Sequence, residues 1–387
     1  MLVPAMAAIH PNLAHSISRA ALDGAAADLA ATIPTATNDE LMVGVLRIVA
    51  MVSSKGCDAH TGAFIWSTGT YPVDSLPLRL WLFPGESGGS LVIVDALPPY
   101  QDLVGATIEM IDGIAQAEAR QRLEPIIPRD NDQTIRLLAP RYLLIPQVLR
   151  GLGIAGEGPV SLALTTRTGE AKTVGVEPIP MPDYNAWAGP YGLHLPADPE
   201  VPYLSRIDDA LWWTRLADAE TLYVQWNRVD RVPVRTLDDL RDELHKADVA
   251  RVVLDVRHNF GGEVSAVDPM LDHFTDPAID QPGRLFAITG RNTFSAASLF
   301  VARLDAETDA TIVGEPMGGC PTAYGDSSDV ILPFSGIVVS VAGMLEVGVS
   351  ADDPRLTIEP DVAVSLTVDD WASGSDPAPG IVATYVP

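Results

Sequence analysis

The stretch RLFAITGRNTFSAASLFVARLD, residues 284–305, indicates the fold of the C-terminal half. Its first part is an uninterrupted apolar run, as a buried parallel strand requires. A turn with small and hydroxyl side chains follows, and then a helical segment that contains alanine, leucine and phenylalanine. We therefore expect a strand that ends at a tight turn and leads directly into a helix.

Strand and helix patterns alternate on both sides of this stretch. TLYVQWNRV (221–229), ARVVLDVR (250–257) and ATIVG (310–314) each predict a strand. Between the first two, LDDLRDELHKA (237–247) has leucines on one face, and Thr236 is expected to cap this helix. Such alternation is typical of a parallel sheet covered by helices, so we predict an α/β domain.

The N-terminal part of the chain has a helical pattern. DELMVGVLRIVAMVSS (39–54) predicts a helix that Asn38 caps and that Lys55 and Gly56 end. Its apolar residues lie almost all round, so the helix should be buried. We expect residues 1–75 to form an N-terminal helical segment.

A small β module is predicted next. LPLRLWLF (76–83) and SLVIVDALP (90–98) have strand patterns. Residues 158–180 predict a hairpin whose turn lies near Thr168 and Gly169. The module is expected to extend over residues 76–182.

The region between the β module and the α/β domain is rich in proline and glycine. It reads PMPDYNAWAGPYGLHLPADPEVP (180–202), and such a composition is typical of a linker. The α/β domain is therefore expected over residues 183–387.

Composition restricts the function classes. The formal net charge is -26, which argues against binding of nucleic acid or of an anionic membrane surface. No apolar run reaches the roughly 18 residues that span a bilayer, and the first residues do not have the pattern of a signal peptide. Cys57 and Cys320 are too few for a disulfide framework or a zinc cluster, so a reducing cytoplasm is expected.

Ser295 lies where the predicted strand ends and the helix begins. Chemistry in open α/β sheets gathers at the carboxyl ends of strands. A helix N-terminus also offers backbone N–H groups and the positive end of its dipole, which can stabilise an oxyanion. The alternative is that Thr293 or Ser295 is merely the cap of the helix.

Two further stretches carry chemically suitable residues. LDVRHNFGG (254–262) ends a strand with Gly261 and Gly262, whose backbone can approach a ligand and present N–H groups to it. GCDAHTG (56–62) contains His60, although a lone histidine in a loop is often structural or solvated.

Together these pieces resemble the tail-specific, C-terminal-processing serine peptidases of family S41 and their tricorn-core relatives. The similar segments occur in the family's order and read CDAHTG, LDVRHNFGG, NTFSAASLF, IVGEPMGG and IEPDVAV. The resemblance implies a crotonase/ClpP-like α/β core and a PDZ-like β module at 76–182. It also implies Ser295 as the nucleophile.

One departure from the bacterial members determines which residue is expected to act as the general base. Those enzymes pair the serine with a lysine about 25 residues later, and here that position is Cys320. No lysine follows Lys246, so a Ser–Lys dyad is excluded. His60 matches the base of tricorn-like members, and a histidine suits proton transfer near neutral pH. Cys320 is expected to be either a small apolar filler or a thiol within reach of Ser295.

The acid that would orient His60 is left open. Tricorn-like members place a glutamate before the Pro-Asp turn, and Asp353 is the best match in GVSADDPRLTIEPDV (348–362). Asp352 and Glu359 are the alternatives, and all three fit solvated loop acids equally well. The serine that precedes the family's histidine is Ala59 here, so the contact must be made differently or not at all.

The sequence therefore predicts a serine hydrolase, and specifically a peptidase, that uses no metal or organic cofactor. Ser295 would attack the carbonyl, His60 would transfer the proton and Asp353 would orient the histidine. The N–H of Ala296 and one from Gly261 or Gly262 would bind the oxyanion. The substrate would be a peptide or a small acyl compound.

Two alternatives remain, a hydrolase of small esters or amides on the same scaffold and a non-catalytic protein that binds peptides at a strand edge.

Overall fold

The computed structural model describes residues 2–66, 71–189 and 194–385. The chain forms two compact units. The first comprises Met1–Leu195 and Tyr324–Leu345, and the second comprises Pro196–Ala323 and Glu346–Pro387. The predicted helical segment and β module thus fall in one unit, while the boundaries expected at residues 75 and 182 stay predictions.

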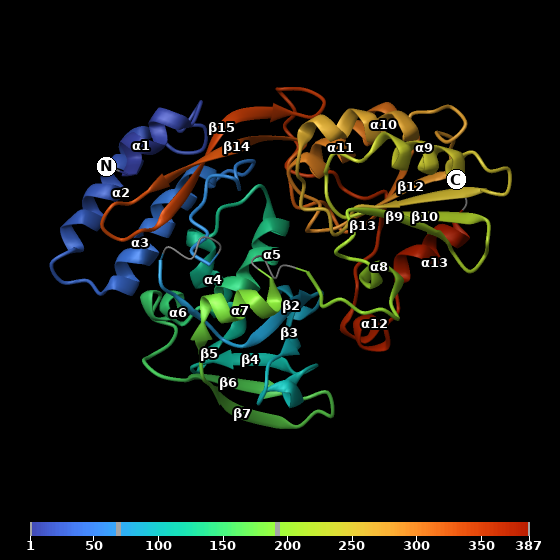
Figure 1. The fold of residues 1–387 in the computed structure, drawn as a ribbon. Coiled ribbons are helices and arrows are strands. Elements are labelled where there is room, and N and C mark those ends of the chain that lie inside the picture. The colour runs from blue at the N-terminus through green and yellow to red at the C-terminus, as the bar shows by residue number, and fades with distance from the viewer. Residues whose placement is uncertain (1, 67–70, 190–193, 386–387) are drawn as a thin grey trace. The chain divides into compact units, whose positions relative to one another are not determined.

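The first unit begins with helices, as its sequence predicts (Figure 1). Its helices are α1 (Leu2–Ile9), α2 (Arg19–Thr32), α3 (Asn38–Ala50), α4 (Gln116–Leu123), α5 (Asp132–Tyr142), α6 (Pro146–Gly151) and α7 (Met181–Ala188), with single turns at η1 (Met51–Ser53), η2 (Glu86–Gly88), η3 (Gln101–Leu103) and η4 (Glu124–Ile126). The helix predicted at 39–54 is confirmed as α3 with η1. Its cap is Thr37 rather than Asn38, because Thr37 and Glu40 form a capping box through their side chains and backbone N–H groups.

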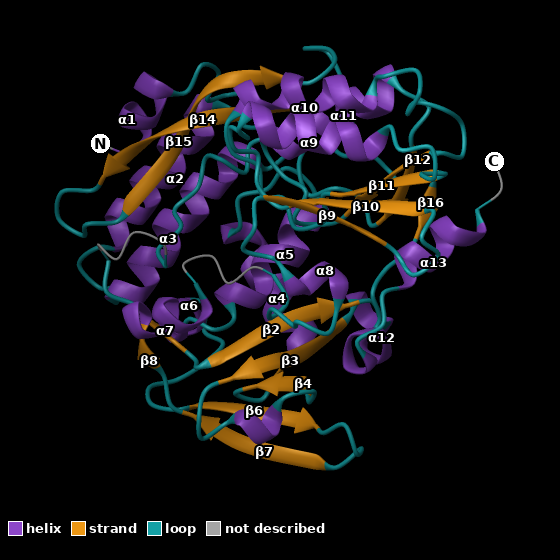
Figure 2. Ribbon diagram, turned by 45° about the vertical axis from the view of Figure 1, so that its right-hand side comes forward, coloured by secondary structure: helices purple, strands orange, loops and turns teal. Residues whose placement is uncertain are grey.

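The β module of the first unit contains an antiparallel sheet in the order β2-β3-β4-β6-β7 (Figure 2). Its strands and the short ones beside them are β1 (Asp74–Ser75), β2 (Leu78–Phe83), β3 (Ser90–Ala96), β4 (Thr107–Ile111), β5 (Ile114–Ala115), β6 (Val160–Thr165), β7 (Ala171–Val176) and β8 (Ile179–Pro180). The predicted strands and the hairpin are confirmed, and Gly169 in its turn has a φ of 82°.

Three departures from the predictions concern this unit. Helices α4, α5 and α6 interrupt the expected β module, and α5 begins with a capping box at Asn131. Residues 181–188 of the expected linker form α7, while its residues 190–193 lie outside the described part of the chain. The paired strands β14 (Thr322–Ile331) and β15 (Val338–Val347) were not predicted, because β14 is mostly exposed and polar beyond its buried first residues.

The second unit is an α/β layer structure, as predicted. Its remaining elements are α8 (Pro202–Ser205), β9 (Leu211–Arg215), β10 (Thr221–Trp226), α9 (Val234–Leu244), β11 (Arg251–Asp255), η5 (Val264–Ala266), α10 (Val267–Phe274), β12 (Leu285–Thr289), α11 (Ala296–Glu307), β13 (Thr311–Gly314), β16 (Val362–Ala363), α12 (Val368–Ser373) and α13 (Pro377–Thr384). The sheet order is β16-β13-β12-β11-β10-β9, parallel except for the edge strand β9.

Helices cover both faces of this sheet. Apolar residues of α9, α10 and α11 pack with one face in a continuous core, while α13 packs on the other (Figure 1). Thr236 does not cap α9, because the helix begins at Val234 directly after Pro233, whose φ of -55° already suits helix entry. Parallel strands bring their carboxyl ends to one edge, and the loops that carry Asn259 and Ser295 leave the sheet there.

No helix among the described residues is both long and apolar enough to cross a membrane.

Candidate active site

Ser295 occupies a strained position between β12 and α11. Its φ of 55° and ψ of -130° lie in a region that residues other than glycine rarely adopt. Ser295 occupies the N-cap position of α11, but its side chain makes no capping hydrogen bond to the helix. A strained serine at a strand–turn–helix junction is the geometry that exposes a nucleophile at the end of a sheet.

The neighbouring hydroxyl groups have structural partners. Thr293 Oγ1 donates to the carbonyl of Val256 at 2.8 Å and accepts the N–H of Gly290 at 3.1 Å. Ser298 is buried, and its Oγ donates to the carbonyl of Thr293 at 3.1 Å. These two hydroxyls therefore fix the turn that carries Ser295.

Gly261 packs its backbone against this turn, and Gly262 packs against the backbone of Val229. A Cβ added at Gly261 would lie 2.6 Å from Cβ of Ser295 and 3.0 Å from the nitrogen of Ala296. A Cβ added at Gly262 would lie 2.3 Å from the carbonyl oxygen of Val229. Both glycines also have φ in the left-handed region, 95° and 144°. Only glycine allows these approaches without displacing the nucleophile turn or the backbone at Val229.

Two backbone N–H groups beside the serine have no hydrogen-bond acceptor in the described part of the chain. They belong to Ala296, the first residue of α11, and to Gly262. The N–H of Gly261, in contrast, donates to Oδ1 of Asn259 at 3.0 Å. Unsatisfied N–H groups at a helix N-terminus and in a glycine turn are the donors that an oxyanion requires.

Asn259 holds these parts together, a role that the sequence analysis missed. Its side-chain Nδ2 donates to the backbone carbonyl of Trp226 at 2.9 Å, and its backbone carbonyl accepts the N–H of Phe294 at 3.1 Å. Together with the bond to Gly261, it links the end of β10 to both turns. Asparagine two residues before a Gly-Gly pair at a strand end was the available signal.

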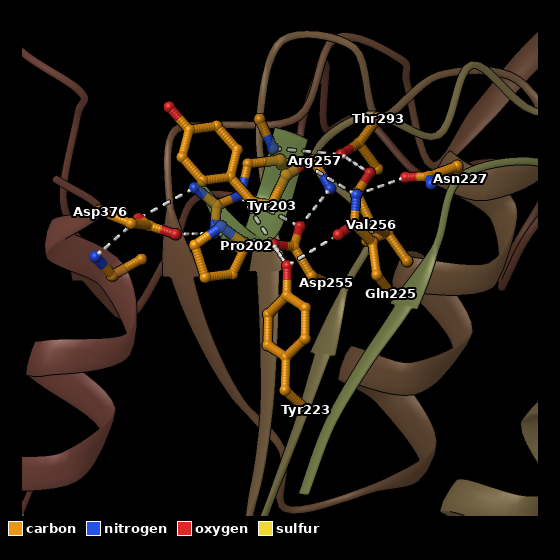
Figure 3. A network of polar contacts seen from close by, with 12 residues as sticks. Pro202, Tyr203, Tyr223, Gln225, Asn227, Asp255, Val256, Arg257, Thr293 and Asp376 are labelled. Atoms are coloured by element: carbon orange, nitrogen blue, oxygen red, sulfur yellow. Dashed lines mark hydrogen bonds and ion pairs between the residues drawn. The ribbon is translucent and has the colours of Figure 1, made fainter. Parts of the chain in front are cut away.

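A buried ionic network supports the same strand ends (Figure 3). Arg257 is 2.7 Å from a carboxylate oxygen of Asp255 and 2.8 Å from one of Asp376, and it lies over the ring of Tyr203. Burial lowers the pKa of Arg257, but the two carboxylates outweigh this effect and raise the pKa well above its ordinary value. Arg257 therefore remains charged and structural.

Asp353, the predicted orienting acid, has a cationic partner in the second unit. Its carboxylate accepts from Arg355 at 2.7 Å, and Arg355 also binds Asp305 at 3.1 Å. The hydrogen bond from Arg355 lowers the pKa of Asp353, so the carboxyl is ionised and already paired. The two alternatives, Asp352 and Glu359, are exposed.

His60 lies in a tight turn of the first unit. The N–H of Thr61 donates to both the backbone carbonyl and Oδ1 of Asp58, at 3.3 and 3.2 Å. The N–H of Ala59 donates to Oδ1 of Asp130 at 2.7 Å, which fixes the opposite side of the turn. Thr61 Oγ1 accepts from the N–H of Ala342 in β15 at 3.1 Å.

The surroundings of His60 favour its neutral form. Burial lowers the pKa of His60 below its ordinary value, while the charge of Asp58 and a hydrogen bond with the backbone of Tyr324 oppose this shift. A neutral imidazole near physiological pH can accept a proton. The electrostatics therefore suit a general base whose imidazolium form is stabilised by a nearby carboxylate.

Both cysteines are disulfide-bonded, which corrects the expectation of free thiols. Cys320 follows two glycines that pack on the nucleophile turn, and the N–H of Gly319 donates to the carbonyl of Thr293 at 3.1 Å. Cys320 is thus neither an apolar filler nor a reactive thiol. Two cysteines far apart in a sequence give no pattern from which a bond could be predicted.

The predicted site residues are distributed over both units. Ser295, Ala296, Gly261 and Gly262 lie together in the second unit, and Asp353 belongs to the same unit. His60 belongs to the first unit.

Comparisons with known proteins identify the fold. No family model and no curated protein matches the chain. Among solved structures, mature CPAF in complex with lactacystin is 13% identical, with a TM-score of 0.62, and the match covers 91% of this chain and 89% of that one. A serine-to-alanine mutant of CPAF is 12% identical, with a TM-score of 0.63 and coverage of 94% and 92%. The chain therefore shares the fold of CPAF.

Proposed function

We propose that the chain is a serine peptidase that cleaves peptide bonds through an acyl-enzyme. The observation that carries this proposal is the strained Ser295, held against a glycine backbone with the N–H groups of Ala296 and Gly262 beside it. The fold adds support, because the structural neighbours include serine proteases and one of them, CPAF, was solved in complex with lactacystin.

In the proposed reaction Ser295 Oγ attacks the substrate carbonyl and His60 accepts the hydroxyl proton. The tetrahedral oxyanion would accept hydrogen bonds from Ala296 and Gly262, since the N–H of Gly261 is already used by Asn259. Collapse of this intermediate breaks the C–N bond, and the imidazolium of His60 protonates the leaving amine. Water, deprotonated by His60, then hydrolyses the acyl-enzyme. Each oxyanion donor contributes a factor of about 10²–10³ to the rate.

The orienting acid remains part of the proposal. Asp353 is the position that the family resemblance selects, but its carboxylate is paired with Arg355. Ionisation supports the assignment, whereas the existing ion pair weakens it. A Ser–His pair without Asp353 would still perform both proton transfers.

The finer fold assignments also belong to this proposal. A crotonase/ClpP-like core is supported by the parallel sheet with helices on both faces. A PDZ-like module is supported by the antiparallel sheet whose edge strand β2 lies beside helix α5. Such an edge is suited to binding an extended peptide, which is also what a non-catalytic peptide-binding protein would use.

The state of the two cysteines changes the expected cellular compartment. The two cysteines of the chain, Cys57 and Cys320, are both disulfide-bonded. Disulfides persist in oxidising compartments and are rare in a reducing cytoplasm, so the bond argues against the expected cytoplasmic location. The substrate would be a peptide, with a small ester or amide as the alternative.

Peptide hydrolysis by purified variants tests the proposal. Ser295→Ala should abolish turnover of a fluorogenic peptide library, and Ser298→Ala, which removes a hydroxyl from the same helix, should retain most of it. His60→Ala should be inactive as well. An active Ser295→Ala variant would refute the mechanism, while hydrolysis of esters but not of any peptide would favour the small-molecule alternative.

A further inference from the structure

Two histidines of the N-terminal segment hold the carboxylate of Asp58. His10 Nε2 and His15 Nε2 lie 3.0 and 3.1 Å from the same oxygen, Oδ2. The side chains of His10 and Asp58 are fully buried, and that of His15 is 13% exposed. The ring of Tyr324 packs against both imidazoles, with centroid distances of 4.7 and 4.6 Å.

The side chains of His10, His15 and Asp58 are close enough together to bind a metal ion. The hydrogen bonds of His10, however, exclude His10 as a metal ligand. Its Nδ1 accepts the backbone N–H of Asn12 at 3.0 Å, so Nδ1 carries the lone pair. The proton of the neutral ring then sits on Nε2, which faces Asp58. A metal ligand needs a lone pair at that nitrogen. His10 is therefore a hydrogen-bond donor to Asp58.

The second carboxylate oxygen of Asp58 acts on the turn of His60. Oδ1 accepts the N–H of Thr61, so one carboxylate connects the N-terminal histidines to the residue that follows His60. Burial raises the pKa of Asp58, but the hydrogen bonds from His10 and His15 outweigh it, and the net effect is a lowered pKa. The carboxylate is thus ionised, buried and two residues from the imidazole.

We propose that Asp58, clamped by His10 and His15, positions His60 and stabilises its imidazolium form during catalysis. The N-terminal segment then contributes to the function of His60 as the base through Asp58, although none of its residues touches the substrate. The other titratable groups against this turn are Asp130, which accepts the N–H of Ala59, and Tyr324, whose backbone bonds the imidazole. This inference rests on the proposed function of His60.

Substitution of the carboxylate is the first test. Asp58→Asn removes the negative charge, and its amide group would face two N–H donors. The expected result is a fall in kcat of about tenfold or more with KM within twofold, because Asp58 acts on the proton transfer and not on substrate binding. The acidic limb of the kcat/KM profile should move to lower pH, because the charge no longer favours the imidazolium.

The histidines provide a second test that does not alter the turn itself. The double variant His10→Leu, His15→Leu removes both donors, whereas His10→Gln, His15→Gln restores an N–H at each position. The glutamine pair should recover at least part of the kcat that the leucine pair loses. Equal kcat for the two double variants, both folded by their melting curves, would overturn the inference.

A matched control is the exposed pair His245 and Asp276, also 3.1 Å apart. Asp276→Asn should leave kcat and the pH profile unchanged. If Asp58→Asn is folded and has an unchanged kcat and an unchanged acidic limb, this inference is overturned. If His60→Ala is inactive in the same assay, the proposed function nevertheless stands. An active His60→Ala would overturn both. Stoichiometric zinc in the purified protein, lost in His10→Leu, would also overturn the hydrogen-bonded assignment.

Discussion

Replacement of Gly261 by alanine should damage both folding and activity. A Cβ at this position would lie 2.6 Å from Cβ of Ser295, 2.8 Å from the carbonyl of Phe294 and 3.0 Å from the nitrogen of Ala296. None of these atoms is the end of a flexible side chain. To reach ordinary contact at 3.4 Å, the serine would have to move by about 0.8 Å, which is 3.4 minus 2.6.

Two costs add up in this variant. Alanine at a φ of 95° costs about 1–2 kcal/mol, and the steric overlap costs about 1–3 kcal/mol. Urea unfolding should therefore show a loss of about 2–5 kcal/mol in the free energy of unfolding. Displacement of a nucleophile by nearly 1 Å lowers the rate by about 10²-fold, which peptide hydrolysis at saturating substrate would measure.

Gly113 offers the matched control. Its φ is 80°, but an added Cβ would meet nothing within 4 Å, so Gly113→Ala carries the backbone cost alone. It should lose about 1–2 kcal/mol and keep full activity. If Gly261→Ala were as stable as Gly113→Ala and equally active, the packing of Gly261 on the nucleophile turn would be refuted.

Three further predictions concern the rest of the proposed site. Asn259→Ala should lose about 1–3 kcal/mol of stability in urea unfolding and at least tenfold in the kcat of peptide hydrolysis, because buried partners of Asn259 lose their hydrogen bonds. A near-normal kcat would contradict the organising role of Asn259. The kcat/KM of the wild type should rise with pH through a pKa below the ordinary histidine value of about 6.5, since burial lowers the pKa of His60, and a limb well above 7 would contradict this electrostatic account. Thiol titration of the denatured, unreduced protein should detect no free cysteine, and recovery of Cys57 and Cys320 as free thiols from protein purified under oxidising conditions would contradict their disulfide bonding.

Regular periodicity made the core of the fold predictable from sequence. The apolar runs of β11 and β12, and the helical pattern of α11, are local signals that match their buried positions. The pair β14 and β15 was missed because β14 exposes polar residues over most of its length, which gives no alternating pattern. The linker prediction failed at α7, where Pro180 precedes the first turn and does not interrupt it.

The residues of the proposed site were predictable where a short local segment of sequence contains a recognisable pattern. Ser295, Gly261 and Gly262 stand at strand ends and follow from local pattern together with family resemblance. The bond between His10 and Asp58 joins residues 48 positions apart, and no periodicity reports such a contact. The same holds for the disulfide bonding of Cys57 and Cys320, which sequence spacing could not reveal.

Covalent labelling of the intact protein identifies the nucleophile. A fluorophosphonate reacts only with an activated serine, and tandem mass spectrometry of the digested adduct identifies the modified residue. We expect one adduct per chain, on Ser295, absent from His60→Ala and present in Ser298→Ala. An adduct on another residue, or no adduct on a folded and homogeneous protein, would contradict this expectation.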